Sequence, residues 1–342
     1  MSPVPRSWSK QRGAALIVAL LVFALSAAIL VSLEKDSQLF YQRMSNGLIH
    51  QQTKAYLLGA EQLGIALLTL DQTLDAESDS PRDTLLEMWA QASPPYPIEG
   101  GGMLAGRLED LEGRFNLNNL IGTVAPTGES QNLTIDQLVF LRLLLTLENE
   151  QGALLQDFEA RSLLQAIGDW LDSDRNPRVD GAEDLEYQSR QPPYRAANQP
   201  MVSPSELMAV RGMTPEIYEA LQDVVTVWPV DGSKINIHTA PASILRALPG
   251  ATDSRPLSLL EIEPLLQLRE SEGFESVEAL LQHPIFKDNV AAVLATMLDQ
   301  QSNTFLLIAE ASVADRRQQL YSVVSRANGR FEITMRVEGR YL

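Results

Sequence analysis

The chain has 342 residues, of which 45% are apolar, so its length suggests two or three domains with enough apolar material for packed cores. It contains no cysteine, which excludes disulfides and cysteine-ligated metal sites, and its 3 histidines lie too far apart in sequence to favour a histidine-rich site. The formal net charge of -17 argues against nucleic-acid binding, because an acidic surface repels phosphate and favours cations or basic partners.

The first predicted element is an uncharged apolar run from Ala14 to Leu33. A helix of about 20 residues rises about 30 Å, which is enough to cross the hydrocarbon core of a bilayer. Arg6, Lys10 and Arg12 precede the run and are predicted to stay in the cytoplasm. The rest of the chain is therefore expected to face the periplasm.

Three interpretations of this segment are open: a plain signal anchor, a secretory signal cleaved near the small residues 24–27, and a prepilin-type signal. An ordinary signal peptidase cuts after the apolar run. Here Arg12-Gly13 stands before the run, so cleavage between Gly13 and Ala14 would remove a short basic leader and keep the membrane helix. The position of the charges favours the prepilin interpretation.

A long helix is predicted to continue beyond the membrane. No proline occurs between Ala14 and Leu70, and apolar residues recur there at helical spacing. One helix could run through the whole stretch, half in the membrane and half along a globular head; an anchor followed by a separate amphipathic helix also fits. The recurring apolar residues are Leu39, Phe40, Met44, Leu48, Tyr56, Leu57, Ala60, Leu63 and Leu67.

The next region changes in composition. Residues Asp75 to Gly102 are rich in serine, proline, glycine and acid, which predicts a loop with a short helical piece around Leu85 to Trp89. The stretch from Met103 to Leu120 then predicts a strand, a turn at Glu112-Gly113 and a second strand.

The C-terminus is predicted to form strands over Thr304–Val313, Gln318–Ala327 and Arg330–Tyr341, with Asn328-Gly329 as a strong hairpin signal. Strands therefore flank a long helical middle on both sides. This order predicts an α+β fold: one antiparallel sheet, packed on the N-terminal helix and interrupted by a large inserted all-α domain.

The middle of the chain, about residues 132–301, contains two similar pieces, which start at Ser203 and Asn236. Each has a proline-containing cap, a short helix, a glycine turn and another helix, and looks like the helix-hairpin-helix or SAM-like pattern. DNA-binding versions contact phosphate, whereas acids surround both pieces here, so we predict packing or protein contact instead. These acids are Glu206, Glu216, Glu219, Asp223, Glu261, Glu263, Glu270 and Glu272.

An acidic loop lies between Gly168 and Tyr187. Counted from Asp172, oxygen-bearing side chains fall at positions 1, 3, 5, 9 and 12, the ligand spacing of an EF-hand loop, and such ligands suit calcium. Pro177 replaces the EF-hand glycine, so the loop cannot follow the standard turn, although the ligand types are kept. A solvated acidic loop is the alternative. The candidate metal ligands are Asp169, Asp172, Asp174, Asn176, Asp180, Glu183 and Asp184.

Catalysis has little support in the sequence, and we expect no enzyme. The chain has no cysteine nucleophile, no G-x-S-x-G elbow and no Walker loop. The run Gly100-Gly101-Gly102 lacks the lysine and the following helix of a phosphate loop. Paired carboxylates could serve a glycosidase, but their dense spacing suits a cation better.

The N-terminal segment resembles that of type IV pilins and pseudopilins. With Ala14 as the first mature residue, Val18 is the fifth, where most of that family carries a glutamate that pairs with a neighbouring subunit's free amine. Absence of this glutamate is a mark of the K-type minor pseudopilins of bacterial type II secretion systems. That family also carries a D-W-x-D-x-D…G-A-E motif and binds calcium near it. The match covers Asp169, Trp170, Asp172, Asp174, Gly181, Ala182 and Glu183.

The resemblance implies a minor pseudopilin at the tip of the secretion pseudopilus, which helps initiate assembly and export of folded proteins across the outer membrane. It implies I-type and J-type minor pseudopilins as partners, cleavage by a prepilin peptidase, methylation of the Ala14 amine, and one or two calcium ions. The chain would be anchored once in the inner membrane. A membrane-tethered DNA-uptake receptor and a periplasmic enzyme are the alternatives.

The resemblance also suggests a division of the chain into parts. Residues 1–13 would be the leader and residues 14–34 the transmembrane helix. The pilin-like head would begin with residues 35–125 and end with the strands of residues 303–342. The helical domain with its calcium loop, residues 126–302, would be inserted between them.

Overall fold

The computed structural model describes residues 12–91, 93–98, 101–121, 133–250, 255–286, 288–313 and 316–339, in two compact units, residues 1–56 and 57–342. Helix α1 runs without a break from Arg12 to Asp75, which confirms one long helix over an anchor with a separate helix. Of the predicted leader, residues 1–11 lie outside the described residues.

In the first unit, α1 exposes its apolar side chains. Phe23 is 73% exposed, and an 18-residue window of the helix has a mean hydropathy of 3.0 with none of it buried. Such a surface is stable in hydrocarbon rather than in water. The helix is therefore long and apolar enough to cross a membrane, as a single-pass anchor would.

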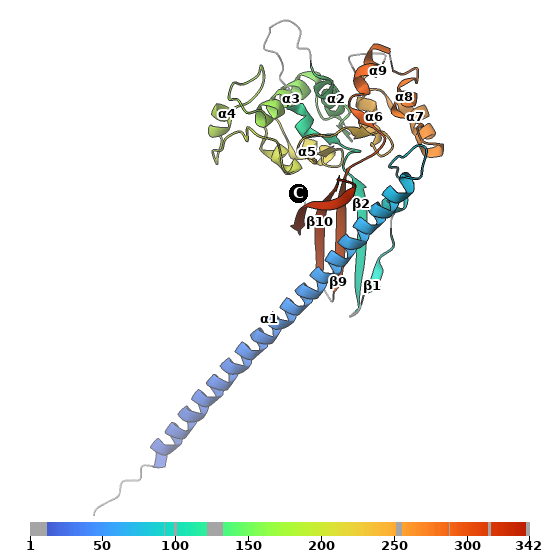
Figure 1. The fold of residues 1–342 in the computed structure, drawn as a ribbon. Coiled ribbons are helices and arrows are strands. Elements are labelled where there is room, and N and C mark those ends of the chain that lie inside the picture. Colours follow the sequence, from blue (N-terminus) through green and yellow to red (C-terminus); the bar gives the residue numbers. More distant parts are fainter. Residues whose placement is uncertain are drawn as a thin grey trace, which may run out of the picture. The chain divides into compact units, whose positions relative to one another are not determined.

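The second unit contains an antiparallel sheet of five strands in the order β1-β2-β9-β10-β11 (Figure 1). At the turn between β10 and β11, Asn328 (φ 51°) and Gly329 (φ 73°) both adopt the left-handed conformation that a tight hairpin needs, so this predicted hairpin is confirmed. The strands are β1 Tyr96–Ile98, β2 Gly102–Asp110, β9 Thr304–Val313, β10 Arg316–Ala327 and β11 Arg330–Glu338.

Two details differ from the expectation for these regions. The stretch predicted as a loop contains strand β1, which pairs with β2, and its helical piece is a 3-10 turn, η1 Met88–Ala90. Of the last predicted strand, residues 340 and 341 lie outside the described part of the chain.

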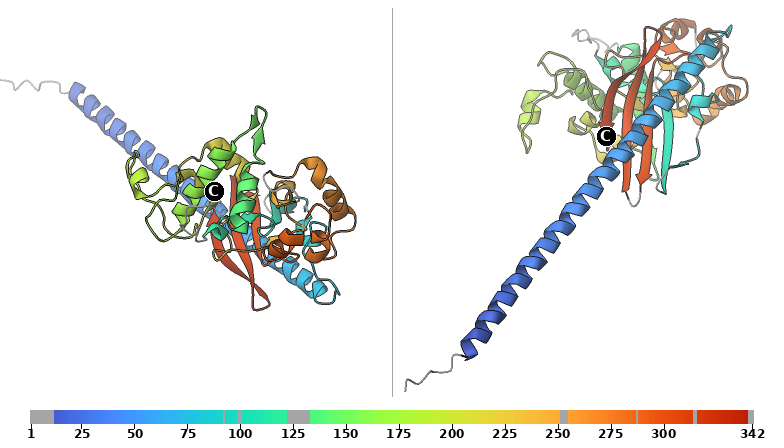
Figure 2. Two further views of the ribbon diagram at one scale, coloured as in Figure 1. Left: turned by 90° about the horizontal axis from the view of Figure 1, so that it is seen from above. Right: turned by 60° about the horizontal axis from the view of Figure 1, so that its bottom comes forward.

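The last part of α1, from Leu57 onward, packs on one face of this sheet (Figures 1 and 2). Glu61 is buried there and accepts hydrogen bonds from Ser322 on β10 and Arg336 on β11. Gly64 faces Leu307 so closely that any Cβ would collide with its Cδ1 atom. A pilin-like helix packed on an antiparallel sheet is thus confirmed as the fold.

The insertion lies between β2 and β9 and gathers beyond one end of the strands (Figure 1). Buried apolar side chains from Phe115 to Leu298 form its core. Its helices are η2 Leu117–Leu120, α2 Ile135–Leu144, α3 Asp157–Leu171, α4 Asp184–Gln188, η3 Pro204–Ala209, α5 Pro215–Leu221, α6 Ala242–Ala247, α7 Leu259–Ser271, α8 Val277–Leu281 and α9 Asp288–Leu294. Its short strands are β3 Phe115–Asn116, β4 Glu148–Asn149, β5 Gly152–Ala153, β6 Val225–Thr226, β7 Ile235–Asn236 and β8 Leu298–Asp299.

The predicted hairpin over Met103–Leu120 is wrong in its second half. Strand β2 ends at Asp110, and β3 pairs in parallel with β6 instead of returning along β2. The reason is burial: Phe115 is fully buried in the helical core, with its ring centroid 5.2 Å from that of Phe140. The segment after Asp110 therefore carries the chain out of the sheet and into the insertion.

Both similar pieces of the insertion form short helices, and the first has its predicted turn at a glycine. In the first piece Gly212 (φ 87°) separates η3 from α5, and Thr214 caps α5 by accepting from the Ile217 amide. In the second, α6 and α7 flank a connection whose residues 251–254 lie outside the described residues. The predicted domain boundary at residue 125 also lies outside them, so the exact domain limits stay a prediction.

Candidate metal centre

The acidic loop begins where α3 ends. This helix buries its apolar face and starts with a capping interaction, in which Glu159 accepts from the Gln156 amide at 2.9 Å. It ends at Leu171, and Asp172 follows in an extended conformation. The Asn198 amide donates to the Trp170 carbonyl at 2.9 Å, so the end of α3 is joined to the segment beyond the loop.

Three aromatic rings hold the two ends of the loop together. Trp170, the last aromatic residue of α3, meets Tyr187 of α4 edge to face at 5.3 Å between centroids. Tyr187 in turn stacks on Tyr194 at 5.3 Å, and the Arg190 guanidinium lies 5.2 Å from the Tyr187 ring centroid. Because these rings pack in the core, the acidic residues between them are confined to a short arc.

Within the arc, carboxylates shape the backbone. Asp172 accepts from the Asp174 amide at 3.3 Å, and Asp174 accepts from the Asn176 amide at 2.7 Å. Asp169 accepts from the Arg178 amide with both oxygens, at 3.3 and 3.2 Å. Gly181 passes so close that a Cβ there would collide with Asp169 Oδ2, which explains the need for glycine in this part of the motif.

Three of the predicted ligands converge. Asp172, Asp174 and Glu183 each offer a carboxylate oxygen, and these oxygens lie within 4.8 Å of one another. Glu183 is buried, and its Oε1 atom has no hydrogen-bond partner among the described residues. Burial, followed by the charge of Asp169, raises the pKa of Glu183 to about 7. An orphaned carboxylate oxygen beside two others is what a bound cation would satisfy.

Arg178 supplies a positive charge from within the loop. Its guanidinium lies 3.4 Å from Asp169 Oδ1 and 2.9 Å from Asp172 Oδ2. Even so, burial raises the pKa of Asp169 to about 6 and also raises that of Asp172. Sequence reasoning missed this residue, although an arginine inside an acidic run was a readable signal. One guanidinium only partly balances the charge of the group.

The structure places the other predicted ligands differently. The Asn176 side chain donates to Asp174 at 3.2 Å, and Asp184 accepts from the Ala196 amide at 3.2 Å. Asp180 has a positive φ of 60°, and its carbonyl oxygen accepts from Arg211. These three residues therefore support the loop, while the converging group consists of Asp172, Asp174 and Glu183.

The converging group has the chemistry of a calcium site. Calcium takes oxygen ligands at about 2.3–2.6 Å, so two ligands of one ion can lie up to about 5 Å apart. Oxygens within 4.8 Å of one another meet this limit. The residues present thus fit calcium, with Asp172, Asp174 and Glu183 as the residues that would hold it.

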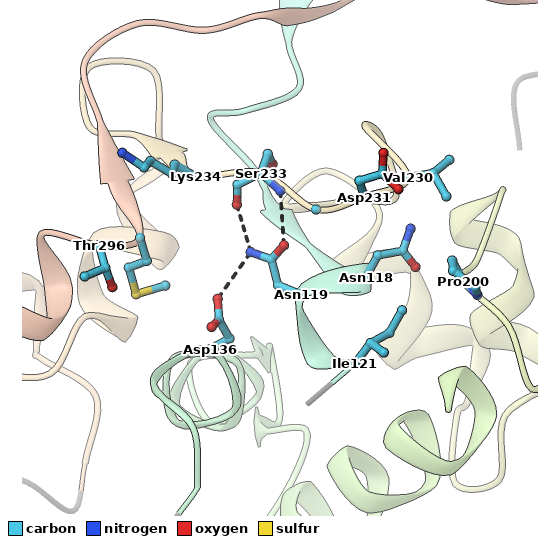
Figure 3. A pocket seen from close by; sticks show the side chains of 12 residues that line it. Asn118, Asn119, Ile121, Asp136, Pro200, Val230, Asp231, Ser233, Lys234 and Thr296 are labelled. Carbon is cyan, nitrogen blue, oxygen red and sulfur yellow. Dashed lines mark hydrogen bonds between the residues drawn. The ribbon is translucent and has the colours of Figure 1, made fainter. Parts of the chain in front are cut away.

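A separate polar cavity of about 620 Å³ lies where the chain passes from β6 to β7 (Figure 3). Asn119 occupies its centre, donating to Asp136 at 3.2 Å and to the Ser233 carbonyl at 2.8 Å. Ser233 returns a hydrogen bond from its amide at 3.1 Å. These polar groups already form hydrogen bonds with one another. We therefore interpret the residues around the cavity as a contact between parts of the insertion.

The predicted processing site lies at the other end of the chain. Gly13 and Ala14 both belong to the first turn of α1, which begins at Arg12. The residues that precede this turn are outside the described part, so cleavage there stays a prediction.

Comparison with known proteins identifies the family. Two family models described as type II secretion system protein K match residues 113–230 and 235–301. Type II secretion system protein K of Klebsiella pneumoniae is 32% identical over 97% of this chain and 98% of its own length. The protein of that name from Pseudomonas aeruginosa is 32% identical over 96% of this chain and 93% of its own.

A solved structure agrees with these relatives. One chain in the crystal structure of the GspK-GspI-GspJ complex from the enterotoxigenic Escherichia coli type 2 secretion system superposes with a TM-score of 0.72. The two chains are 27% identical, and the match covers 87% of this chain and 99% of that one. Because the Klebsiella pneumoniae relative is 32% identical along nearly its whole length and both family models match, the chain belongs to the family of type II secretion system protein K.

Proposed function

We propose that this protein is a minor pseudopilin that caps the type II secretion pseudopilus and helps initiate its assembly for the export of folded proteins. The observation that carries this proposal is the similarity to a chain of a solved GspK-GspI-GspJ complex over 87% of the present chain. Its partners would accordingly be the I-type and J-type minor pseudopilins. The role is one of assembly, without catalysis or nucleic-acid binding.

Two features of the chain support a place at the tip. The insertion leaves the sheet after β2 and returns at β9, so this head is far bulkier than a sheet and a helix alone. Such bulk would clash with subunits stacked above it in a filament. Val18 also replaces the glutamate that pairs with a neighbouring subunit in most pilins, and a capping subunit has no neighbour above to pair with.

The membrane end would be processed first. A prepilin peptidase would cut between Gly13 and Ala14, and methylation of the Ala14 amine would follow. The apolar helix would then remain in the inner membrane, with residues beyond it in the periplasm. N-terminal sequencing of protein extracted from membranes tests this step; a mature start near Ala27 or an uncut Met1 would contradict it.

The tip role is tested by co-purification and by labelling. Full-length protein in detergent should co-purify with the I-type and J-type minor pseudopilins in fixed proportion, and the major pseudopilin serves as the negative control. Gold-labelled antibody should decorate filament ends. Labels spread along the shaft of overproduced filaments, or co-purification with the major pseudopilin alone, would overturn the proposal.

We further propose that Asp172, Asp174 and Glu183 hold calcium and thereby stabilise the insertion. A metal that binds only the folded state adds about 2.7 kcal/mol at 100 times its dissociation constant. The buried, unpartnered Oε1 atom of Glu183 supports the proposal, because a cation would satisfy it.

Thermal unfolding with calcium and with chelator, at fixed ionic strength, tests the calcium loop. Glu183→Gln should lose most of the calcium-dependent rise in melting temperature. Asp157→Asn is the control, since Asp157 begins helix α3, which leads into the acidic loop, and forms an exposed pair with Arg161. If the wild type melts at the same temperature with and without calcium, the loop is a solvated acidic segment.

A further inference from the structure

A second group of buried carboxylates lies at the end of α1, far from the acidic loop in sequence. Asp71 belongs to the last turns of the helix, and Asp83 and Glu87 come from the segment that follows it. One carboxylate oxygen of each lies within 4.8 Å of the others. Asp75, one helical turn after Asp71, adds a fourth carboxylate, whose charge acts on both Asp71 and Glu87.

Two acids of this group are buried, and two of its four acids have a carboxylate oxygen without a partner among the described residues. Asp83 is 0% and Asp71 9% exposed. The Oδ2 atoms of Asp71 and Asp75 are both buried and have no hydrogen-bond partner among the described residues. An ionised carboxylate buried without a partner is costly, so these oxygens require a proton or a cation.

Local rules also disfavour acids in these positions. The carbonyl end of a helix carries a partial negative charge, and like charges four residues apart repel each other. Asp71 and Asp75 break both rules at once, and no basic residue lies in the described last turn of α1. Acids kept in such a place point to a positive charge that compensates them.

The protein itself supplies little of that charge. The guanidinium of Arg326 lies 3.4 Å from Asp83 and 5.1 Å from the Phe331 ring centroid. This one guanidinium acts on Asp71, Asp75 and Asp83, and burial raises the pKa of Asp71 and of Asp83 to about 7 in spite of it. The remaining charge is unbalanced within the described residues.

We propose that Asp71, Asp83 and Glu87 form a second calcium site, which joins the end of the long helix to the head. All the ligand atoms are oxygens, which selects a hard divalent cation. Calcium accepts several protein carboxylates in a flexible geometry, whereas magnesium usually keeps several waters and binds one or two carboxylates, so three converging carboxylates favour calcium. Glu87 is already oriented, since it accepts from the Thr84 amide at 3.0 Å and from the Trp89 indole at 2.7 Å.

Such a site would lie near Ser302, where the chain returns from the insertion to the sheet. Asp83 accepts from the Ser302 amide at 2.6 Å, just before β9, and its carbonyl accepts from Asn236 at 2.9 Å. A cation on Asp83 and Asp71 would therefore tie together the helix end, the following loop and the return of the chain from the insertion. Calcium would then set how firmly the helix is held to the head.

The experiment uses the full-length protein in detergent and calcium alone as the probe. Titration calorimetry and melting temperatures are compared for the wild type, Asp71→Asn, Glu183→Gln and the double variant. Asp79→Asn is the control, because Asp79 is an exposed acid of the same segment. Glu183→Gln separates this site from the acidic loop, so the two calcium proposals fail independently.

We expect Glu183→Gln to keep one class of calcium site and the double variant to lose it. Asp71→Asn should melt higher than the wild type in chelator, because it removes an unbalanced charge, and should gain less from calcium. If Asp71→Asn raises the melting temperature equally with calcium and with chelator, protons neutralise the group and the proposal is wrong. The same holds if Glu183→Gln abolishes all calcium binding.

A second readout does not depend on how well Asp71→Asn folds. Trp89 donates to Glu87, so terbium bound at this site should luminesce when tryptophan is excited. In the Glu183→Gln background this signal should appear, calcium should displace it, and Glu87→Gln should lower it at least tenfold. A signal unchanged by Glu87→Gln would overturn the assignment.

Discussion

Glu61 and Asp71 both lie on the part of α1 that packs on the sheet, but their charges are balanced differently. Glu61 has a side chain 1% exposed, and the guanidinium of Arg336 binds both of its oxygens, at 2.9 and 2.7 Å. Asp71 lies less than three helical turns further on, is buried to a similar degree and has an oxygen without any described partner. The first acid is a structural joint between helix and sheet, whereas the second has the properties of a ligand.

The comparison shows that burial alone does not tell the two roles apart. A buried acid with a full set of donors fixes the packing of the elements it joins. A buried acid that lacks them leaves a charge that something else has to neutralise. Substitutions at balanced and unbalanced groups should therefore have opposite effects on stability.

The largest effect is expected from breaking the balanced pair. Arg336→Met would leave Glu61 buried without its cation, which should lower the free energy of unfolding by about 3 kcal/mol. Arg317→Met, which breaks an exposed pair with Glu310, should cost below about 1 kcal/mol. Melting temperatures of the full chain in detergent check this. Equal losses in both variants would remove the distinction between Glu61 and exposed acids.

An unbalanced acid should show itself in the pH dependence. Burial, followed by the charge of Asp110, raises the pKa of Glu112 from 4.5 to about 7. The folded state then binds this proton more tightly, so stability falls as pH rises from 4.5 to 7, by at most about 1.4 kcal/mol per pH unit. Glu112→Gln should flatten that decline and exceed the wild type at pH 8. If the stability of Glu112→Gln and that of the wild type changed equally with pH, the proton bound by Glu112 would not be the cause of the decline.

A buried base should give the opposite slope. Burial, followed by the charges of Arg82 and Arg269, lowers the pKa of His238 from 6.5 to about 4. The unfolded state then binds this proton more tightly, so stability is lost as pH falls from 6.5 to 4. His238→Phe keeps a ring beside Phe274 and should weaken the acid-side loss. A variant as acid-sensitive as the wild type would exclude His238 as its source.

A smaller effect is expected where α1 touches the sheet. A Cβ at Gly64 would collide with the buried side chain of Leu307, so Gly64→Ala should lower the free energy of unfolding by about 1 kcal/mol. Overpacking of this size outweighs the gain in helix propensity. A rise in the melting temperature of Gly64→Ala would show that Leu307 can move aside.

The smallest effect, of opposite sign, is expected five residues earlier on the same helix. Nothing lies within 4 Å of a Cβ added at Gly59, so Gly59→Ala should gain about 0.5–1 kcal/mol from helix propensity alone. Together with Gly64→Ala, this change separates the face of the helix that packs on the sheet from the face that does not. A loss of stability at Gly59 would place a contact there.

Features that depend on neighbours in sequence could be predicted. The uninterrupted apolar spacing after Ala14 gave the long helix, and Asn328-Gly329 gave the last hairpin, because both signals are local. The convergence of Asp172, Asp174 and Glu183 was also foreseeable, since all three lie in one short segment. Local patterns specify local geometry, and the sheet followed from having strands at both ends of the chain.

Features that depend on distant contacts were missed. The sequence pattern predicts a returning strand at Phe115, whereas its burial against Phe140, which needs the folded structure to be seen, places it in the helical core. The group of Asp71, Asp83 and Glu87 is not predictable from the sequence, because its members come from helix α1 and from the segment after it. The guanidinium of Arg326 beside Asp83 comes from β10. No spacing rule connects these positions before the fold is known.

The order of strands has a consequence for how the protein folds. β2 and β9 are neighbours, with Asp110 opposite Phe305, although the whole insertion separates them in sequence. Pairing them requires closure of a very long loop, and such distant pairing slows folding even though the entropic cost grows only slowly with length. An insertion with its own core can fold first and bring the ends of β2 and β9 together. The speed at which the sheet forms would then be set by how fast the insertion folds.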